Sequence, residues 1–540
     1  MKHLEIYLFP IDAQRFQAVA SQSPAGDGSA ESSLPFWQGA LDRRKTLIKL
    51  LELSSGFRAE AFPDADEQDW MIQESLLAPD RQSFHPAYLE TVGQRLYQAL
   101  FPVGSSLRST FETSLRLAEP EPANEDLHLR LKFAANSAER SRLADYPWEL
   151  LHDGQRFLLH HRVVLSRYLA YEALPPALPS QAQLRVLLIS STASDPAQGL
   201  IKLPETEQQA IRQGLSKAET SGVIALESLS PVTRRGLSIY LTDCDPSLRP
   251  QVIHFDGHGL YGKRCINPDC RQMHNSTKVE RCRRCQHLLP DSEGFLLFKG
   301  ESGGSDYVSA REFAALLPSG VALVVLSACQ SGMAVAGESL FNGTAQQLID
   351  ARIPAVVAMQ YMVRVDAASQ FSEQFYRVLG KKEPLVVALR EGRKWMMELV
   401  NQWYRPVLYL RWRDNGGGQL FQEMLEPELS DSSKFYDSQI APPTPLLPRS
   451  EWLRLYQDLM NAFEDTDDFQ KMLELYVGEN FEALSSRYKP YDNRVLDTVK
   501  RLNGEGKSVA LVSGAVQAKP QSPHLQYWRD WLNRLEDGTA

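Results

Sequence analysis

Short apolar runs alternate with amphipathic stretches between residues 184 and 410, and this alternation predicts most of the fold. The runs RVLLIS, QVIHFDG, ALVVLSA and PAVVAMQ are rich in aliphatic and β-branched residues, as buried parallel strands are. Between them, apolar residues recur at helical spacing, so we expect helices over 204–218, 310–317, 338–351, 366–379 and 384–400. This order of elements predicts a doubly wound, mostly parallel α/β sheet with flanking helices.

The first hundred residues show a weaker pattern. LEIYLF predicts an opening strand, and the Ser/Gly-rich segment 20–33 predicts a mobile loop. Helical spacing is present over 37–53 and over 88–101, and the strict alternation of LHLRLKF at 127–133 predicts a half-buried strand. We therefore assign no fold to an N-terminal region over 1–89.

The character of the chain changes after residue 415, which predicts a second domain. Residues 416–448 include an acidic stretch rich in serine and proline, a composition typical of a linker. Beyond it, WLRLYQDLMNAF, DDFQKMLELYVG and NRVLDTVKRLNGEG carry apolar residues at i, i+3, i+4 and i+7. We expect a separate all-α domain over 449–540.

Composition narrows the class of protein. The chain has 540 residues, of which 43 % are hydrophobic and 23 % charged, so it can bury a sizeable core. Its apolar runs are far shorter than the ~20 residues that span a bilayer, and the N-terminus lacks the apolar core of a secretory signal. We therefore expect a cytoplasmic protein. The net charge of −9 argues against a chain-wide surface for nucleic acid.

Two of the predicted strands end in residues that can do chemistry. QVIHFDG runs into His258 and Gly259, and ALVVLSA runs into Cys329. Parallel strands end at one edge of a sheet, so both tips should lie together. An imidazole beside a thiol takes its proton or pairs with the thiolate, and main-chain N–H groups of Gly259 and Cys329 could bind an oxyanion. A buried structural cysteine and histidine also explain these residues taken alone.

The surrounding sequence resembles the CHAT family of caspase-like peptidases, in the clan of caspases and separase. The resemblance covers about 90–415 and rests on HFDGHG, LSACQSG, IPAVVAMQYMVRVDAASQFSEQFY, PLVVALREGRK and the upstream YPWELLHDGQRFLLHHRVVLSRYL. It implies a caspase-like fold and a cysteine endopeptidase that cleaves a specific protein. It also implies Cys329 as the nucleophile, His258 as its general base or imidazolium partner, and His254 as structural.

Two acids near these motifs are candidate substrate-binding residues. Asp256 stands where similar sequences often carry a small residue; it either orients or charge-stabilises His258, or is a solvated loop acid. Asp366 stands where relatives carry an acidic loop near the active site; it either recognises a basic residue of the substrate or caps the helix that follows. The preferred residue before the scissile bond stays open.

Four cysteines lie in the loop after the His258 motif. They form the pattern C-x4-C-x11-C-x2-C, with Cys265, Cys270, Cys282 and Cys285. Four thiolates at this spacing can surround Zn²⁺ and leave no open coordination position, so we predict a structural zinc ribbon over 263–287. His274 or His287 could replace one ligand, and disulfides are not expected in a reducing cytosol.

The predicted ribbon is basic. It carries seven Lys/Arg, namely Lys263, Arg264, Arg271, Lys278, Arg281, Arg283 and Arg284, against the two acids Asp269 and Glu280. A solvated basic surface is the simplest interpretation. The alternative is a surface for an acidic substrate, a regulator or nucleic acid.

The C-terminal segment resembles the effector-associated, death-fold-like adaptor domains of bacterial conflict systems. The resemblance rests on LYQDLMNAFEDTDDFQKMLELYVGENFEALS and VLDTVKRLNGEGKSVALVSGAV. It implies an adaptor-domain partner protein; a plain helical domain is the alternative. Together the resemblances imply prokaryotic defence or regulated cell death, with a gasdermin-like pore former as a possible substrate. A catalytically inactive binding protein of the same fold and a nucleic-acid-responsive sensor remain alternatives.

Overall fold

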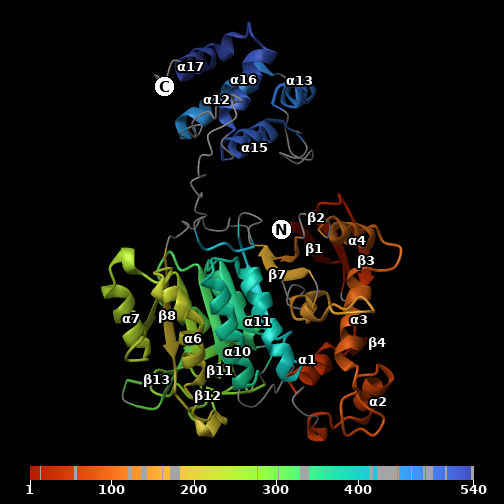
Figure 1. Cartoon of the computed structure of the whole chain (residues 1–540), viewed down its shortest axis with the longest axis vertical. Coiled ribbons are helices and arrows are strands. Elements are labelled where there is room, and N and C mark those ends of the chain that lie inside the picture. The colour runs from red at the N-terminus through yellow and green to blue at the C-terminus, as the bar shows by residue number, and fades with distance from the viewer. Residues whose placement is uncertain are drawn as a thin grey trace, which may run out of the picture. The chain divides into compact units, whose positions relative to one another are not determined.

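The computed structural model contains two compact units, Met1–Leu425 and Glu426–Ala540, and each is described by itself (Figure 1). The structure describes all residues except 13, 40, 54–57, 119–124, 135–142, 161, 171–182, 277, 302, 329–339, 362, 413–416, 422–446, 448, 464, 478, 480, 482–490, 505–506 and 537–540. The predicted linker 416–448 therefore lies largely outside the described residues, and Cys329 lies wholly outside them.

The first unit is built on one 11-stranded sheet of order β3-β2-β1-β6-β7-β17-β16-β15-β10-β8-β9. The pairs β2–β3, β1–β2 and β16–β17 are antiparallel and the remaining neighbours are parallel. The strands are β1 Lys2–Pro10, β2 Arg15–Gln22, β3 Ser29–Ser33, β6 Leu127–Ala134, β7 Val163–Ala170, β8 Leu184–Ser190, β9 Ile224–Ser228, β10 Val252–Gly257, β15 Leu323–Ala328, β16 Ala355–Met359 and β17 Pro406–Leu410. The doubly wound, mostly parallel sheet expected from the sequence is confirmed.

Helices flank this sheet, and the five predicted between 204 and 400 are all present. The helices of the unit are α1 Arg44–Glu52, α2 Ala65–Gln73, α3 Tyr88–Leu100, α4 Ser106–Ala118, α6 Thr206–Thr220, α7 Arg234–Asp243, α8 Ala310–Leu316, α9 Leu340–Asp350, α10 Val365–Leu379 and α11 Leu385–Val400. Helices α6, α10 and α11 lie side by side on one face (Figure 1), whereas α8 packs between α7 and α9.

Strand β10 is covered on both faces, which explains its continuous apolar pattern. All six of its residues are buried. The Phe255 ring lies 5.2 Å from that of Phe298 on β13 (Glu293–Lys299) and 6.3 Å from that of Phe313 on α8. The His254 ring points the other way, with Nδ1 2.9 Å from the Tyr376 hydroxyl on α10. A strand with two buried faces places its last residues deep between the two helical layers.

The N-terminal region corrects one expectation. Segment 20–33, predicted as a mobile loop, contains the end of β2 and all of β3, which pair antiparallel. The buried face of this hairpin uses small side chains, Ala18, Ala20 and Ala30, which apolar patterning does not single out. A Cβ at Gly28 would lie 2.5 Å from Thr110 Oγ1, so the hairpin packs tightly against α4. Of the helix expected over 37–53, only α1 forms.

Strand β6 corrects a second expectation. LHLRLKF was predicted to be half buried, but its polar residues His128 and Arg130 are also buried. Neighbouring strands supply a partner to each: His128 Nε2 lies 2.7 Å from Ser166 Oγ on β7, and Arg130 pairs with Glu5 on β1 at 3.4 Å. The polar face of β6 is therefore buried as well, because residues that are distant in the sequence pair with its side chains.

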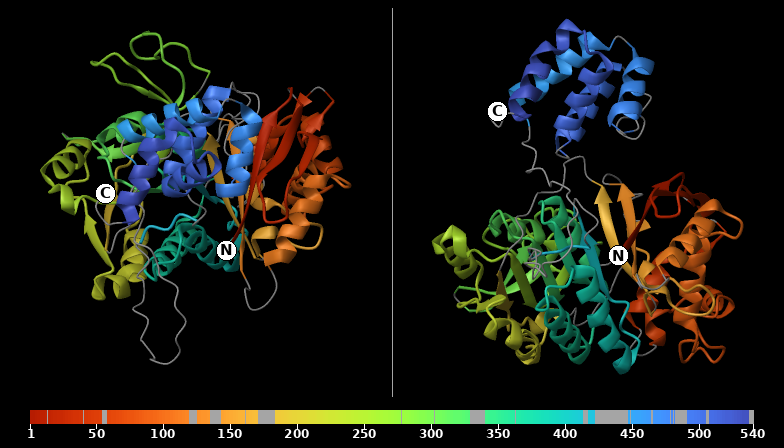
Figure 2. Two further views of the ribbon diagram at one scale, coloured as in Figure 1. Left: turned by 90° about the horizontal axis from the view of Figure 1, so that it is seen from above. Right: turned by 45° about the horizontal axis from the view of Figure 1, so that its top comes forward.

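A smaller sheet of order β12-β11-β13-β14 follows β10. Its strands are β11 Gly259–Arg264, β12 Met273–His274, β13 Glu293–Lys299 and β14 Ser305–Ser309. The predicted ribbon is the long connection between β11 and β13, and it projects from the rest of the unit (Figure 2, left). A small apolar cluster that includes Leu200, Met273 and Tyr307 packs this sheet against the segment that ends at Leu200.

The second unit is all-α, as expected. Its helices are α12 Arg449–Ala462, α13 Thr466–Met472, α15 Tyr491–Gly504, α16 Ser508–Ala518 and α17 Gln526–Glu536. These helices pack together (Figure 2, right). They enclose a separate core that includes Leu459, Phe469, Val499 and Trp528. In the part of the chain that the structure describes, no helix combines the length and the apolar character needed to cross a membrane.

Candidate active site and cysteine cluster

The two strands that precede the predicted catalytic positions end at the same edge of the sheet. Strands β10 and β15 are parallel neighbours, and their last paired residues are Gly257 and Ala328. His258 and Cys329 each follow directly in the sequence. Cys329 itself lies outside the described residues, so of the predicted pair the structure describes only His258.

His258 is fully buried between β10 and β11. Its ring Nε2 donates a hydrogen bond to the Ile201 carbonyl, and its own carbonyl accepts one from the Leu297 N–H at 2.9 Å. A carbonyl only accepts, so Nε2 carries the proton. In the neutral ring Nδ1 is then the nitrogen with the lone pair. The side chain is thus fixed in the tautomer whose Nδ1 can take up a proton.

The glycine before His258 has a packing reason. A Cβ at Gly257 would lie 2.9 Å from two ring atoms of Phe255 and 3.0 Å from Ser191 Cβ, so a larger residue would displace the strand end. Gly257 does not adopt a positive φ, and close packing explains the glycine there. Gly259, the predicted oxyanion residue, is buried and opens β11 opposite Leu296.

A buried polar cluster lies below His258 on the face covered by α6 and α10. His254 contacts Tyr376 through Nδ1, and its Nε2 lies 3.5 Å from Glu207 Oε1. Glu207 in turn accepts a hydrogen bond from the Ser372 hydroxyl at 2.8 Å. The expectation that His254 is structural agrees with this packing, because the ring joins β10 to both helices.

Asp256 belongs to the same face, which corrects the interpretation of a solvated loop acid. It lies on β10, is 6 % exposed, and accepts a hydrogen bond from the Ser190 hydroxyl at 2.7 Å. Burial raises the pKa of its carboxyl to about 8; repulsion from Glu207 adds to this, and the Ser190 hydrogen bond opposes it. Below that pH the carboxyl is mostly neutral, because burial disfavours its charged form.

Asp366 lies in the first turn of α10. The residue before that helix, its N-cap, is Arg364, so Asp366 is not the cap itself. Its carboxylate accepts two hydrogen bonds from Arg364, at 3.0 and 2.6 Å, and one from the Ala367 N–H. The Arg364 hydrogen bond is the largest effect and lowers the pKa of this carboxyl. The side chain is 45 % exposed and negatively charged at neutral pH.

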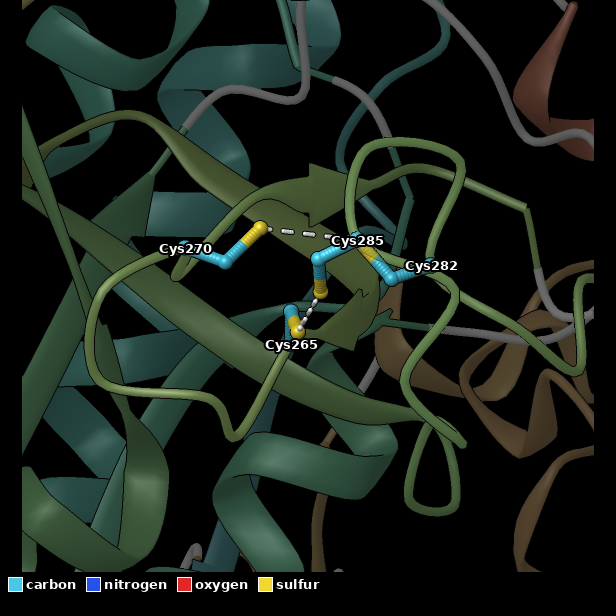
Figure 3. Close-up of side chains that lie close together, drawn as sticks. All are labelled: Cys265, Cys270, Cys282 and Cys285. Atoms are coloured by element: carbon cyan, nitrogen blue, oxygen red, sulfur yellow. Dashed lines mark hydrogen bonds between the residues drawn. The ribbon is translucent and has the colours of Figure 1, made fainter.

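The four ribbon cysteines form one cluster (Figure 3). All four Sγ atoms lie within 4.8 Å of one another, with Cys265 and Cys285 3.5 Å apart and Cys270 and Cys282 3.6 Å apart. Four thiolates around a metal with bonds of about 2.3 Å lie about 3.8 Å apart. The donor set therefore fits a tetrahedral metal ion.

The surroundings of Cys282 favour its thiolate. Burial opposes ionisation, but hydrogen bonds from the Cys285 N–H, the His274 ring and the Arg284 N–H lower the pKa of this thiol to about 5. His274 Nε2 lies 3.4 Å from Cys282 Sγ. His274 therefore contacts a cysteine of the cluster rather than replacing one, an arrangement that orients metal ligands in many proteins.

Sequence reasoning missed a buried ion pair that connects the sheet to the segment before β7. Glu149 and Arg167 are both fully buried and form a salt bridge, and Arg393 on α11 lies 3.8 Å from the same carboxylate. Arg167 also donates to the Gln360 side chain at 2.9 Å, next to β16. The only sequence signal was that both residues fall in YPWELLHDGQRFLLHHRVVLSRYL, a motif quoted for another reason.

Comparisons with known proteins identify one family for this chain. A family model described as the CHAT domain matches residues 90–430. No curated protein matches the chain. Among solved structures, the chain is similar to the Arg-specific cysteine proteinase gingipain R, with 11 % identity over 59 % of this chain and 72 % of that one, and a TM-score of 0.32. It is also similar to the Saccharomyces cerevisiae separase–securin complex, with 13 % identity, 76 % and 30 % coverage, and a TM-score of 0.39.

Proposed function

Because this chain belongs to the CHAT family of caspase-like peptidases, we propose that it is a cysteine endopeptidase in which His258 and Cys329 form the catalytic pair. The observation that carries the proposal is the register of β10 and β15, since both residues directly follow the last paired positions of adjacent parallel strands. The buried ring of His258, with Nε2 bound to the Ile201 carbonyl, supplies the base.

In the proposed reaction, Nδ1 of His258 takes the proton of the Cys329 thiol, and the thiolate attacks the scissile carbonyl. The oxyanion that forms is bound by the main-chain N–H groups of Gly259 and Cys329. The imidazolium then protonates the leaving amine, which departs as the C–N bond breaks. Water, deprotonated by the same ring, hydrolyses the acyl-enzyme and returns the thiol.

The two candidate acids differ in what they can do. Asp366 is exposed and charged, so it is our candidate for binding a basic residue of the substrate, with Arg364 as a competing partner. Asp256 was the other candidate for substrate binding. Its carboxyl is buried beside Ser190 and Glu207, so we assign it to positioning the end of β10.

We propose that the cysteine cluster holds Zn²⁺ in a structural role. The spacing, the distances between the Sγ atoms and the His274 contact to Cys282 all support this metal. Four thiolates leave no coordination position for water or substrate, so the ion stabilises the ribbon and takes no part in hydrolysis.

The resemblances also motivate a biological proposal. We propose a cytoplasmic enzyme of prokaryotic defence or regulated cell death, recruited through its C-terminal helices by an adaptor-domain partner. The separate helical core of the second unit supports an independently folded module. A gasdermin-like pore former is the proposed class of substrate.

The test is cleavage of a proteome-derived peptide library by the full chain and by Cys329→Ala and His258→Ala. Cys244→Ala and His524→Ala are matched controls, because both residues lie outside the site and neither is fully buried. We expect each site variant to lose at least about a thousandfold in kcat/KM, and both controls to keep the wild-type rate.

Two further results would separate the alternatives. Covalent labelling of Cys329 by a peptide electrophile, reduced in His258→Ala, supports a working pair. Absence of both cleavage and labelling, with and without the candidate partner, would replace the peptidase by a binding protein of the same fold.

A further inference from the structure

A cavity of about 470 Å³ lies between the ribbon and the turn that precedes Ile201. The ribbon wall includes Asn275, Ser276, Arg283 and Arg284, and the opposite wall includes Gln198. This volume falls within the ~300–1,000 Å³ of small-molecule sites. The lining contains two guanidinium groups and several neutral polar groups but no carboxylate, so its chemistry suits an anion.

The arginines of the ribbon fall into two groups. Arg264 and Arg271 lie near Glu312, at 2.9 and 3.9 Å, so an acid of the same chain neutralises them. Among the residues that the structure describes, no acid lies within 4.0 Å of Arg283 or Arg284, and both are exposed. Among the described residues no acid lies that near to Lys263, Lys278 or Arg281 either, but of these five cations only Arg283 and Arg284 line the cavity.

The cavity is connected to His258 through a short turn. Asp195 and Leu200 exchange two main-chain hydrogen bonds, of 2.8 and 3.0 Å, and the turn between them contains Gln198. The Tyr307 hydroxyl of β14 donates to the Asp195 carboxylate at 2.7 Å. Ile201 follows Leu200 at the end of this turn, and its carbonyl accepts the hydrogen bond from His258 Nε2. A ligand that bridges Gln198 and the arginines therefore contacts the turn that orients the ring.

We propose that this cavity binds a phosphate-bearing ligand of nucleotide size, with Arg283 and Arg284 on the phosphate and Gln198 on the opposite side. Occupancy is transmitted to His258 through the Asp195–Ile201 turn. Paired guanidinium groups match the oxygens of a phosphate by bidentate hydrogen bonds. The phosphate can come from a free nucleotide or from a nucleotide of a single strand. The inference goes beyond the proposed function, because it assigns a ligand site that peptide hydrolysis does not require. Binding at this site is measured without any cleavage.

The experiment measures calorimetric binding of ATP and of a six-nucleotide single-stranded RNA to the full, metal-loaded chain. The cavity variant is Arg283→Glu/Arg284→Glu. The matched control is Lys278→Glu/Arg281→Glu, which makes the same change in charge within the ribbon at exposed residues that do not line the cavity. Metal content and melting temperature verify that each variant is folded.

We expect the cavity variant to lose at least about tenfold in affinity and the control to stay within about threefold. Tighter binding of ATP identifies a free nucleotide as the source, and tighter binding of RNA identifies a strand. Equal loss in both variants, no binding of either ligand, or tighter binding of hexaglutamate than of both would overturn the phosphate site.

The connection to the catalytic ring has its own readout. In protein labelled with ¹⁵N-histidine, the His258 ring signals, assigned with His258→Ala, should shift and saturate with the same affinity as the calorimetric binding. Bound ligand with unchanged His258 signals would overturn the transmission through Ile201, whatever the peptidase activity.

Discussion

The sheet edge and the ribbon lie next to each other in the chain but are held together by different means. His258 follows a strand whose six residues are all buried between two helical layers. The ribbon begins a few residues later, and its small apolar cluster consists of Leu289 and Val279 with the four cysteines. The sheet is stable through the burial of apolar area, whereas we expect the ribbon to depend on the metal ion proposed for its four cysteines.

This difference determines how each region fails. Damage to the sheet should lower the stability of the whole first unit, because its core is continuous. Damage to the cysteine cluster should unfold the ribbon alone. The predictions below test that separation, from the largest expected effect to the smallest.

Replacing Cys282 by Ala should remove the metal and unfold residues 263–287, while the sheet stays folded. Structural zinc contributes about 10–16 kcal/mol to the folding of small zinc domains, far more than the apolar cluster here can supply. Elemental analysis and limited proteolysis measure the two effects. Cys244→Ala is the control. A ribbon that still resists protease without metal would show that its folding does not depend on the metal.

Replacing Glu149 by Gln should destabilise the first unit by about 3–5 kcal/mol, because Arg167 and Arg393 lose the buried carboxylate between them. Urea denaturation measures this loss, and bound metal should be unchanged. Asp69→Asn, which breaks the exposed pair with Arg81, is the control and should cost at most about 1 kcal/mol. Comparable losses of stability in the two variants would contradict the conclusion that burial makes the Glu149 ion pair more costly to break.

Replacing Asp256 by Asn should change how stability depends on pH. The pKa of Asp256 is about 8 in the folded chain against an ordinary 3.8, so between these values the folded state binds a proton that the unfolded state does not. Wild-type stability therefore falls as pH rises through this window, by up to about 1.4 kcal/mol per pH unit. The asparagine variant lacks this loss.

Urea denaturation from pH 5 to pH 8.5 measures the difference between the two proteins. His254, Glu207 and Tyr376 face the same space and remain in both. Asp366→Asn is the control: the pKa of Asp366 is lowered from the ordinary 3.8, so its contribution to stability is lost only as pH falls below this range, and this variant should keep the pH profile of the wild type. Parallel pH profiles for wild type and Asp256→Asn would show that Asp256 ionises normally.

Replacing Ser309 by Ala should have the smallest effect, about 1 kcal/mol. Ser309 and Glu312 form a capping box at the start of α8, and Glu312 also accepts from Arg264 at the base of the ribbon. Chemical denaturation measures the cost, with the exposed Ser216→Ala as control. Loss of bound metal in this variant would mean that the ribbon depends on the helix.

The sequence predicts best what neighbouring residues decide. The central strands are uninterrupted apolar runs, and the cysteine spacing is a local pattern; both appear in the structure as expected. The environments of Arg130 and Asp256 depend on Glu5 and Ser190, which are distant in sequence. The hairpin of β2 and β3 was missed because, apart from Phe16, its buried strand residues are alanines, which give little apolar contrast.

Strand β17 has a consequence for the order of folding during synthesis. It is the last strand of the sheet along the chain, yet it lies between β7 and β16 and joins two groups of strands made earlier. At about 5–20 residues per second, the ribosome needs on the order of ten to fifty seconds to proceed from β7 to β17. For that interval both groups present open edges toward each other, so nascent chains should be prone to aggregate and to need chaperones until residue 410 emerges.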